Sequence, residues 1–478
     1  MKCIYENECG SCDHINMEYQ ATLDLKQKNM ENLFGKNIMP VIGMNFPYYY
    51  RYKVTYALGY DYESRQIVCG KYGQGSHDLY EIDDCLIESK DCQKLAHFIT
   101  DLLPKLKIKV YDEDDHTGSL RYIFMRQSFA TGDIMLVLVS ADTFLPGKKH
   151  LIEEIHKNFP KVKSIYLDIN KRTDSMVLTD DLTLLYGEKY LTDKVMGKSF
   201  RLSPLAFYQV NPQQMKKLYQ TAVSFADLKG NEKIIDAYCG IGTIGICASD
   251  HASSIIGIEN NRDAVHDAIF NAKANGVKNA RYICGDAAEL FTEKNIQADV
   301  VFMDPPRAGS SQKFLKSLMK LAPSKIVYIS CNPETLARDT KILEKKYRLE
   351  KVQPVDMFPF TGHVETVVLL SHKKPDGHIN VKVEFGDGDG KVPLDNIAKR
   401  AESYKPKERV TYKMIKEYIE AKYGFKVHTA YIAEVKRDLG LPMYDAPNAV
   451  EELKQPRKHP TPEKVEAIKD ALKHFEVI

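Results

Sequence analysis

Three short polar motifs in the second half of the chain lie at the ends of apolar runs, and they decide the fold. They read Asp304-Pro305-Pro306-Arg307, Ser330-Cys331-Asn332-Pro333 and His363-Val364-Glu365-Thr366. The adjoining runs, residues 299–303, 325–329 and 366–370, are rich in β-branched and aromatic side chains, which predicts buried strands. Ligands of open α/β sheets bind at the carboxyl ends of strands. We therefore expect two carboxylates, Asp304 and Glu365, to meet the thiol of Cys331 in one cleft.

The chain has 478 residues, of which 44% are hydrophobic and 28% charged, and this length suits about two to four domains. A formal net charge of +2 indicates no partner by itself, so a nucleic acid would have to bind a local patch. The N-terminus is polar and no run of about eighteen apolar residues occurs, so we expect neither a signal peptide nor a membrane span. We predict a cytoplasmic monomer in which the ten cysteines serve packing, metal binding or catalysis.

Three cysteines near the N-terminus, Cys3, Cys9 and Cys12, form a CxxxxxCxxC pattern. A fourth ligand would have to come from a distant residue, and Cys85 is the first candidate, ahead of Cys69 and Cys92. Four thiolates suit structural zinc or an iron–sulfur cluster. Reduced thiols without a metal are the simpler alternative.

Residues 45–197 are predicted to be mostly β-structure, interrupted by one helix at about 92–106. Basic residues alternate with tyrosines in this region. Such interleaving is typical of RNA binding, because bases stack on aromatic rings while phosphates pair with cations. The alternative is a solvated strand face above core tyrosines. The basic positions are Arg51, Lys53, Lys71, Arg121 and Arg126.

A strand, a glycine turn and a helix are predicted over residues 233–245, with a GxGxxG pattern from Gly240 to Gly245. The next two predicted strands end near Glu259 and Asp286, where carboxylates would meet a ribose and an adenine. This arrangement fits S-adenosylmethionine as well as NAD, and GxGxxG alone is a weak signal. The motif at Asp304 favours a methyltransferase, since a nicotinamide site would not need it.

The sequence closely resembles the bacterial RNA uracil-C5 methyltransferases, above all the branch that acts on 23S ribosomal RNA. The resemblance runs from Cys3 to about Ser371 and rests on six motifs in register. They are the four cysteines Cys3, Cys9, Cys12 and Cys85, the FxQxN motif at 207–211, and the motifs at 236–242, 304–309, 330–339 and 362–365.

By this resemblance, Cys331 is the nucleophile that attacks carbon 6 of uracil, and Glu365 accepts the proton from carbon 5. The resemblance also implies a [4Fe-4S] cluster on the four cysteines, which replaces the zinc interpretation. Phe207, Arg51, Lys53 and Arg121 are the expected RNA-binding residues. The expected S-adenosylmethionine site comprises Gln209, Tyr238, Gly240, Gly242, Thr243, Glu259, Asp286 and Asp304.

The implied fold is an α/β, Rossmann-like class I methyltransferase domain with an N-terminal iron–sulfur and β-rich RNA-binding domain. The expected segments are a cysteine segment in 1–90, a central RNA-binding domain at 45–197, a catalytic domain at 198–372, a linker at 373–408 and a helical C-terminal extension at 409–478. The extension could help to bind RNA, or it could be a packing or dimerisation module. The expected substrate is a uridine of 23S ribosomal RNA. The alternatives are transfer RNA as substrate, or a non-catalytic RNA-binding assembly factor.

Overall fold

The computed structural model describes residues 1–6, 8–76, 78–113, 115–293, 296–373, 412–439 and 459–475. The chain divides into two compact units, Met1–His378 and Ile379–Ile478. Within the described ranges, no helix combines the length and the apolar character needed to cross a membrane.

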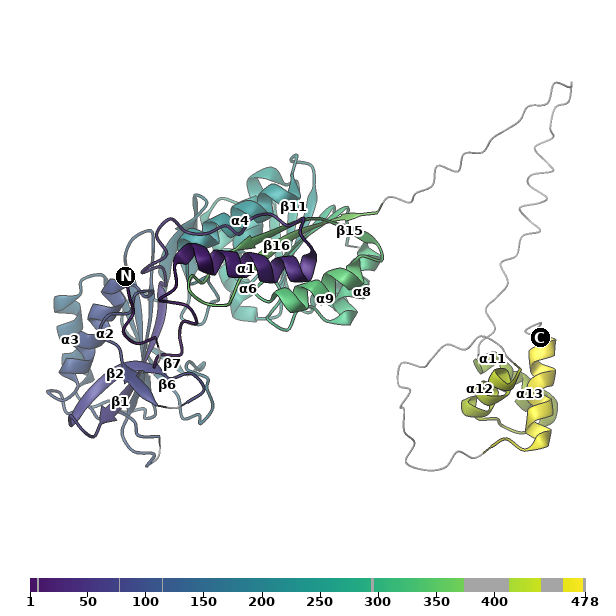
Figure 1. Ribbon diagram of the computed structural model, residues 1–478, viewed down its shortest axis with the longest axis horizontal. Helices are drawn as coiled ribbons and strands as arrows, with labels where there is room; N and C mark the ends of the chain where they lie inside the picture. Colours follow the sequence, from purple (N-terminus) through teal and green to yellow (C-terminus); the bar gives the residue numbers. More distant parts are fainter. Residues whose placement is uncertain are drawn as a thin grey trace, which may run out of the picture. The chain divides into compact units, whose positions relative to one another are not determined.

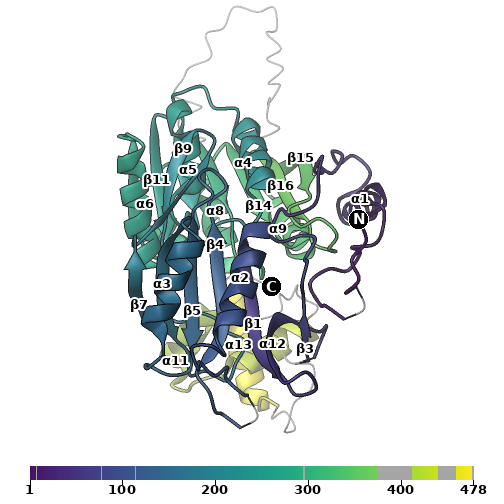
Figure 2. The same cartoon turned by 90° about the vertical axis from the view of Figure 1, so that its left-hand side faces the viewer.

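The first sheet of the larger unit has seven strands in the order β3-β2-β1-β4-β5-β6-β7. Every residue of β4 and β5 is buried, because both faces of the sheet are covered. Helices α2 (Lys90–Leu102) and α3 (Lys148–Asn158) lie over β4 and β5 on one face (Figure 2). The sequence predicted only one of these helices, since α3 buries just Leu151 and Ile155 and most of its other residues are charged or polar. The strands are β1 (Lys53–Asp61), β2 (Gln66–Tyr72), β3 (Leu79–Glu81), β4 (Leu120–Gln127), β5 (Ile134–Ser140), β6 (Val162–Ile169) and β7 (Leu182–Gly187).

The second sheet also has seven strands, in the order β12-β11-β10-β13-β14-β16-β15. Strands β10 to β14 are parallel, whereas β16 is antiparallel to both of its neighbours. The strand order reverses between β10 and β13, which is where ligands of such sheets bind. The predicted α/β, Rossmann-like fold is confirmed. The strands are β10 (Lys233–Ala237), β11 (Ser254–Glu259), β12 (Ala280–Cys284), β13 (Val300–Met303), β14 (Lys325–Ser330), β15 (Tyr347–Val355) and β16 (Glu365–His372).

Helices cover both faces of the second sheet. On one face the core includes Met215 of α4 and Ile244 of α5, and on the other it includes Phe314 of α8 and Leu336 of α9. A hairpin of β8 (Leu191–Val195) and β9 (Lys198–Leu202) joins the two halves of the unit. The helices are α4 (Pro212–Ala226), α5 (Thr243–Ala248), α6 (Arg262–Ala274), α7 (Ala287–Glu293), α8 (Gln312–Leu321) and α9 (Pro333–Leu343).

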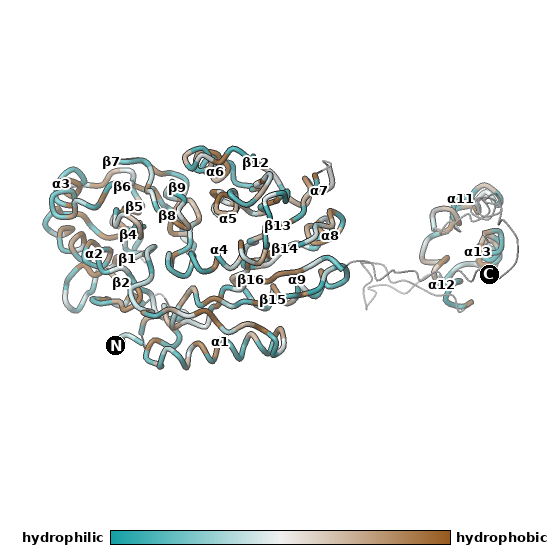
Figure 3. The backbone as a smooth tube through the Cα atoms, turned by 90° about the horizontal axis from the view of Figure 1, so that it is seen from above, coloured by the Kyte–Doolittle hydropathy of each residue, from teal (hydrophilic) through white to brown (hydrophobic). Residues whose placement is uncertain are grey.

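The N-terminal helix α1 (Tyr19–Phe34) lies against β15 and α9, far from it in sequence (Figures 1 and 3). A buried ion pair joins the Nζ of Lys26 to the carboxylate of Asp356 at 2.5 Å, and the Tyr19 hydroxyl donates to the same carboxylate at 2.6 Å. Asp13 lies just before α1, and its carboxylate accepts a hydrogen bond from the backbone N–H of Gly362 at 2.7 Å. The start of the chain thus holds the segment that leads into β16.

In the smaller unit the structure describes residues 412–439 and 459–475, which form the helices α11 (Tyr412–Tyr423), α12 (Thr429–Asp438) and α13 (Pro462–His474) within the expected helical extension. Their apolar faces share one core that includes Ile415, Ile432 and Ile468. The predicted linker at 373–408 lies outside the described residues except for Lys373.

Replacement of Lys26 by Met should destabilise the larger unit by about 3 kcal/mol, because it leaves the buried carboxylate of Asp356 without its cation. Lys28 is exposed on the same helix, so Lys28→Met should change the free energy of unfolding by less than about 0.5 kcal/mol. Urea unfolding followed by circular dichroism measures both. Equal stability of the two variants would show that the ion pair contributes nothing.

Candidate active site

The register of β16 brings Glu365 and Cys331 together. Ser330, the last residue of β14, is paired with Thr366 of β16, so the next positions along the two strands are Cys331 and Glu365. Asp304 follows Met303 at the end of β13, the other neighbour of β14. The two carboxylates and the thiol therefore lie at the ends of three adjacent strands, as the sequence predicted.

Burial dominates the electrostatics of these three groups. Glu365 is only 3% exposed, and its Oε2 has no hydrogen-bond partner among the described residues. Burial, with the nearby charge of Asp304, raises the pKa of Glu365 to about 8. Burial raises the pKa of Asp304 to about 7. The pKa of the Cys331 thiol is raised to about 11 by burial and by the charges of Glu365 and Asp304.

Two cationic features oppose this effect at Cys331. Cys331 precedes Asn332, the N-cap of α9, whose side chain accepts from the N–H groups of Glu334 and Thr335 at 3.1 and 3.3 Å. The positive end of the helix dipole is therefore near the thiol. The exposed Arg307 also lowers the pKa of the thiol. Arg307, His363 and Lys26 line a cavity of about 140 Å³ beside Cys331. The thiol is therefore reachable from outside.

The loop after Asp304 is held by α9. The buried carboxylate of Asp339 accepts hydrogen bonds from the Ser310 N–H and the Tyr328 hydroxyl, each at 2.8 Å. Arg338 binds the same carboxylate and donates to the Ala308 carbonyl at 3.0 Å. The motifs at 304–309 and 330–339 thus form one structural unit that fixes Asp304 relative to Cys331.

The glycine turn after β10 is tied to the end of β11. The carboxylate of Glu259 accepts from the Gly240 N–H at 3.1 Å and from the Asn261 N–H at 2.8 Å. Gly242 has φ +83°, and a Cβ there would lie 3.0 Å from the Tyr282 hydroxyl. Tyr238 also adopts a left-handed conformation, with φ +62°, and its ring packs on Phe314.

The other expected cofactor residues surround this turn. Thr243 begins α5, Gln209 is 7% exposed in the segment before α4, and Asp286 follows β12 with its Oδ1 accepting from the Ala288 N–H at 2.6 Å. Asp236 was not predicted as a site residue, although an acid inside an apolar strand was a visible signal. Its Oδ2 accepts from the Gly245 N–H at 2.8 Å, while its buried Oδ1 has no partner in the described part of the chain. This unpaired carboxylate oxygen and the carboxylate of Glu259 suit a ligand that has an ammonium group and ribose hydroxyls, as S-adenosylmethionine has.

The four cysteines of the N-terminal pattern, Cys3, Cys9, Cys12 and Cys85, line one small cavity. The nearby thiols of Cys85, Cys9 and Cys3 add to burial in raising the pKa of Cys12. No set of three or more His, Cys, Asp or Glu side chains in the described residues is arranged closely enough to hold a metal ion. The thiols would thus have to come closer together to bind one. The competing Cys69 and Cys92 are buried elsewhere, against α2 and the first sheet.

The expected RNA-binding residues divide into two groups. Phe207 is 64% exposed, and the Nζ of the half-buried Lys53 lies 6.0 Å from the centre of its ring. Arg51 is half-buried and donates to the Lys53 carbonyl at 3.3 Å. Arg121, in contrast, is 6% exposed, pairs with Glu113 and donates to two backbone carbonyls. The guanidinium of Arg121 is thus engaged inside the domain except at its Nε, and its contact with RNA stays a prediction.

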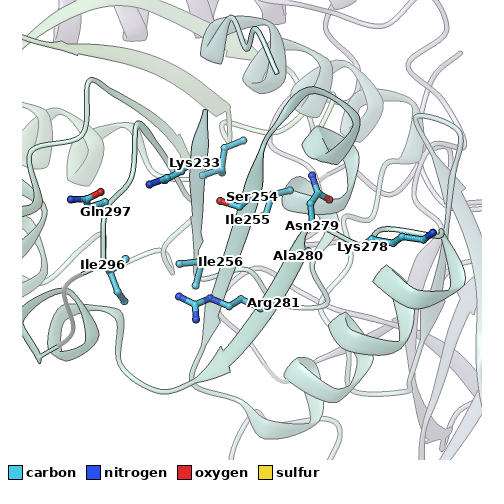
Figure 4. Close-up of a pocket in the computed structure, with 11 residues that line it drawn as sticks. Lys233, Ser254, Ile255, Ile256, Lys278, Asn279, Ala280, Arg281, Ile296 and Gln297 are labelled. Atoms are coloured by element: carbon cyan, nitrogen blue, oxygen red, sulfur yellow. The ribbon is translucent and has the colours of Figure 1, made fainter. Parts of the chain in front are cut away.

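A separate cavity of about 490 Å³ lies at the amino ends of β10, β11 and β12 (Figure 4). Lys233, Ser254 and Arg281 contribute to its lining. This is the edge of the sheet opposite to Cys331, so the cavity is separate from the candidate active site.

The chain is similar to known RNA methyltransferases. The sequence model of the family described as tRNA (Uracil-5-)-methyltransferase matches residues 18–373. An uncharacterized RNA methyltransferase of Halalkalibacterium halodurans is 40% identical over 78% of this chain and 83% of its own length. One of Clostridium tetani is 38% identical over 77% and 82%.

Among solved structures, the tRNA (uracil-54, C5)-methyltransferase of Pyrococcus abyssi in complex with S-adenosyl-L-homocysteine is similar with a TM-score of 0.64 and 26% identity. The match covers 76% of this chain and 86% of that one. From the family match over most of its length, the chain belongs to the tRNA (uracil-5-)-methyltransferase family of RNA methyltransferases.

Proposed function

We propose that this protein methylates carbon 5 of a uridine in RNA, with S-adenosylmethionine as methyl donor, through a covalent bond between Cys331 and carbon 6 of the base. The observation that carries the proposal is the placement of Cys331 beside Glu365 at the register position after Ser330 and Thr366. A nucleophile and a base that meet at the ligand-binding edge of the sheet are what this reaction requires.

The chemistry follows from the residues. Carbon 5 of uracil is a poor nucleophile, and addition of the Cys331 thiolate to carbon 6 turns the ring into an enolate that reacts at carbon 5. The thiol must first lose its proton, and the α9 helix end and Arg307 favour the thiolate. After carbon 5 is methylated, Glu365 removes the proton from carbon 5, and the electron pair of that bond expels the thiolate. One proton is released overall.

The pKa of Glu365 suits the role of a base. A carboxyl group with a pKa of about 8 is a stronger base than an ordinary glutamate and is still partly ionised near neutral pH. Asp304, the neighbour whose charge contributes to that shift, would hold either the uracil edge or the cofactor.

The proposed cofactor site uses the residues around the glycine turn. Bound S-adenosylmethionine supplies an electrophilic methyl group. Glu259 would accept hydrogen bonds from ribose hydroxyls, and the free Oδ1 of Asp236 would accept from an ammonium group. The remaining contacts are proposed for Gln209, Tyr238, Gly240, Gly242, Thr243, Asp286 and Asp304.

For the target we propose a uridine of 23S ribosomal RNA, on the ground of the cysteine pattern and the motif set. Transfer RNA is the second candidate, favoured by the name of the matching family and of the Pyrococcus abyssi protein. Mapping of 5-methyluridine in ribosomal and transfer RNA from a deletion strain distinguishes them. Loss of the modification from neither RNA would contradict the proposed function.

We also propose that Cys3, Cys9, Cys12 and Cys85 hold a [4Fe-4S] cluster. Support comes from the shared cavity, whose walls include the apolar side chains of Ile15 and Ile82. Methylation of this kind needs no electron, so the cluster would be structural. The adjacent Asp13 binds the Gly362 N–H, which links the cysteine segment to the loop before Glu365.

The covalent mechanism predicts different failures for two variants. Glu365→Gln should transfer the methyl group and then remain joined to RNA, because the carbon 5 proton cannot leave. A denaturing gel should show a slow protein–RNA band that depends on S-adenosylmethionine. Cys331→Ala should give neither band nor product. Methylation by Cys331→Ala would exclude the covalent mechanism.

The buried carboxyl of Glu365 predicts a pH-dependent stability. Its pKa is about 8 in the folded protein, against an ordinary value of 4.5, so the folded state binds the proton more tightly. The destabilisation from this group is absent below pH about 4.5 and grows as the pH rises through about 8. Glu365→Gln should therefore stabilise the protein by a few kcal/mol at pH about 9 relative to its effect at pH about 5.

Thermal unfolding at these two pH values measures the difference. Glu344 is exposed, so Glu344→Gln serves as the control and should show no such pH dependence. An equal effect of Glu365→Gln at both pH values would mean that Glu365 is not protonated in the folded protein at neutral pH.

The cluster proposal predicts that protein purified without oxygen is brown and contains about four irons per chain. Cys85→Ser should lose most of the iron, whereas Cys284→Ser, at an exposed cysteine, should retain it. Iron analysis and the visible absorption spectrum measure this. Colourless protein with stoichiometric zinc would contradict the cluster.

A further inference from the structure

Two cations face each other across neighbouring strands of the first sheet. Lys53 of β1 and Arg126 of β4 are direct cross-strand partners. Like charges in this arrangement repel and destabilise a sheet. Arg126 is only 4% exposed and Lys53 is half-buried, so water screens the repulsion poorly.

The guanidinium of Arg126 is incompletely bonded. Its Nη2 donates to the Ala206 carbonyl at 2.7 Å, while Nε and Nη1 are buried without a partner among the described residues. Asp193 is near enough to favour the charge of Arg126. Its carboxylate, however, is already engaged by the Ser128 hydroxyl and the backbone N–H groups of Phe129, Ala130 and Lys194.

Arg126, Lys53 and Arg51 place three positive charges close together, and no ion pair within the described residues neutralises them. No carboxylate in the described part of the chain forms a salt bridge with Arg126, Lys53 or Arg51. Burial and the charges of Arg126 and Arg51 lower the pKa of Lys53 to about 8. Buried N–H groups without partners are costly and uncommon in proteins. An anion bound here would supply the missing acceptors.

The cationic pair is adjacent to the exposed ring of Phe207. Arg126 holds the carbonyl of Ala206, the residue before Phe207, and the Nζ of Lys53 is 6.0 Å from the ring centre. An anion between Lys53 and Arg126 would therefore lie next to any base stacked on Phe207. In RNA, the anion found beside every base is a phosphodiester.

We propose that Lys53 and Arg126 form a subsite for one backbone phosphate of the RNA, next to the nucleotide that stacks on Phe207. The guanidinium has unpaired N–H donors at Nε and at Nη1, each of which a phosphate oxygen can accept, and the ammonium group of Lys53 adds a second cation. Such a contact positions the RNA without reading its sequence. The inference rests on the proposed RNA-methylating function. It adds Arg126 to the expected RNA-binding residues, because Arg126 was identified from the sequence only as one of five basic positions in this region.

The first test measures binding of an oligouridylate of about eight nucleotides over a range of salt concentrations. Lys53→Gln should weaken binding about tenfold and reduce the slope of log K against log salt by about 0.7, the value for one lost phosphate contact to a single strand. Arg126→Lys, which keeps the charge but removes the unpaired guanidinium N–H donors, should also weaken binding. Lys149→Gln, at an exposed lysine of α3, should change neither quantity.

A second measurement locates the contact. With an oligouridylate whose linkages are neutral methylphosphonates, the wild type and Lys53→Gln should bind equally weakly. Binding of the charged oligonucleotide by Lys53→Gln with wild-type affinity and salt slope would overturn the subsite, even if the protein methylates RNA. Absence of uridine methylation by the wild type would instead contradict the proposed function while leaving the binding result to stand.

Discussion

The insertion of the antiparallel strand β16 between β14 and β15 is the constraint on which the active site depends. Because β16 runs against β14, its first residue returns to the edge where β14 ends, and Glu365 meets Cys331 there. A parallel strand in this place would put its first residue at the far edge of the sheet. The segment before β16 is held from outside by Asp13 through the Gly362 N–H, and Lys26 holds Asp356 a few residues earlier.

The electrostatic state of the site follows from the same packing. Helices pack on both faces of the sheet and bury the ends of its strands. This burial raises the pKa values of Glu365, Asp304 and Cys331. The site is thus less stable than an apolar core of the same shape, and perturbed pKa values of this kind are typical of functional sites. Lys53 and Arg126 in the first sheet likewise lower stability, because their charges repel each other at the place where we propose that an RNA phosphate binds.

Much of the second sheet could be predicted from sequence. Its strands are continuous apolar runs that end in polar residues, so Asp304, Cys331 and Glu365 stand out at the edge where ligands bind. The first sheet was harder to predict. Helix α3 was not predicted, because it buries only two residues and most of its other residues are charged or polar. The alternation of basic residues and tyrosines also did not indicate which of these side chains are buried. Arg121 is enclosed by Glu113 and two backbone carbonyls that come from distant segments, and no local pattern contains that information.

The central claim is that Cys331 bonds to carbon 6 of the target uracil. The most direct measurement uses RNA in which the target uridine carries fluorine at carbon 5, because Glu365 cannot remove fluorine as it removes a proton. After incubation with S-adenosylmethionine and protease digestion, mass spectrometry should find the methylated fluorouridine on the peptide that contains Cys331. An adduct on any other residue, or efficient methyl transfer to ordinary RNA with no adduct on the fluorinated RNA, would contradict the account.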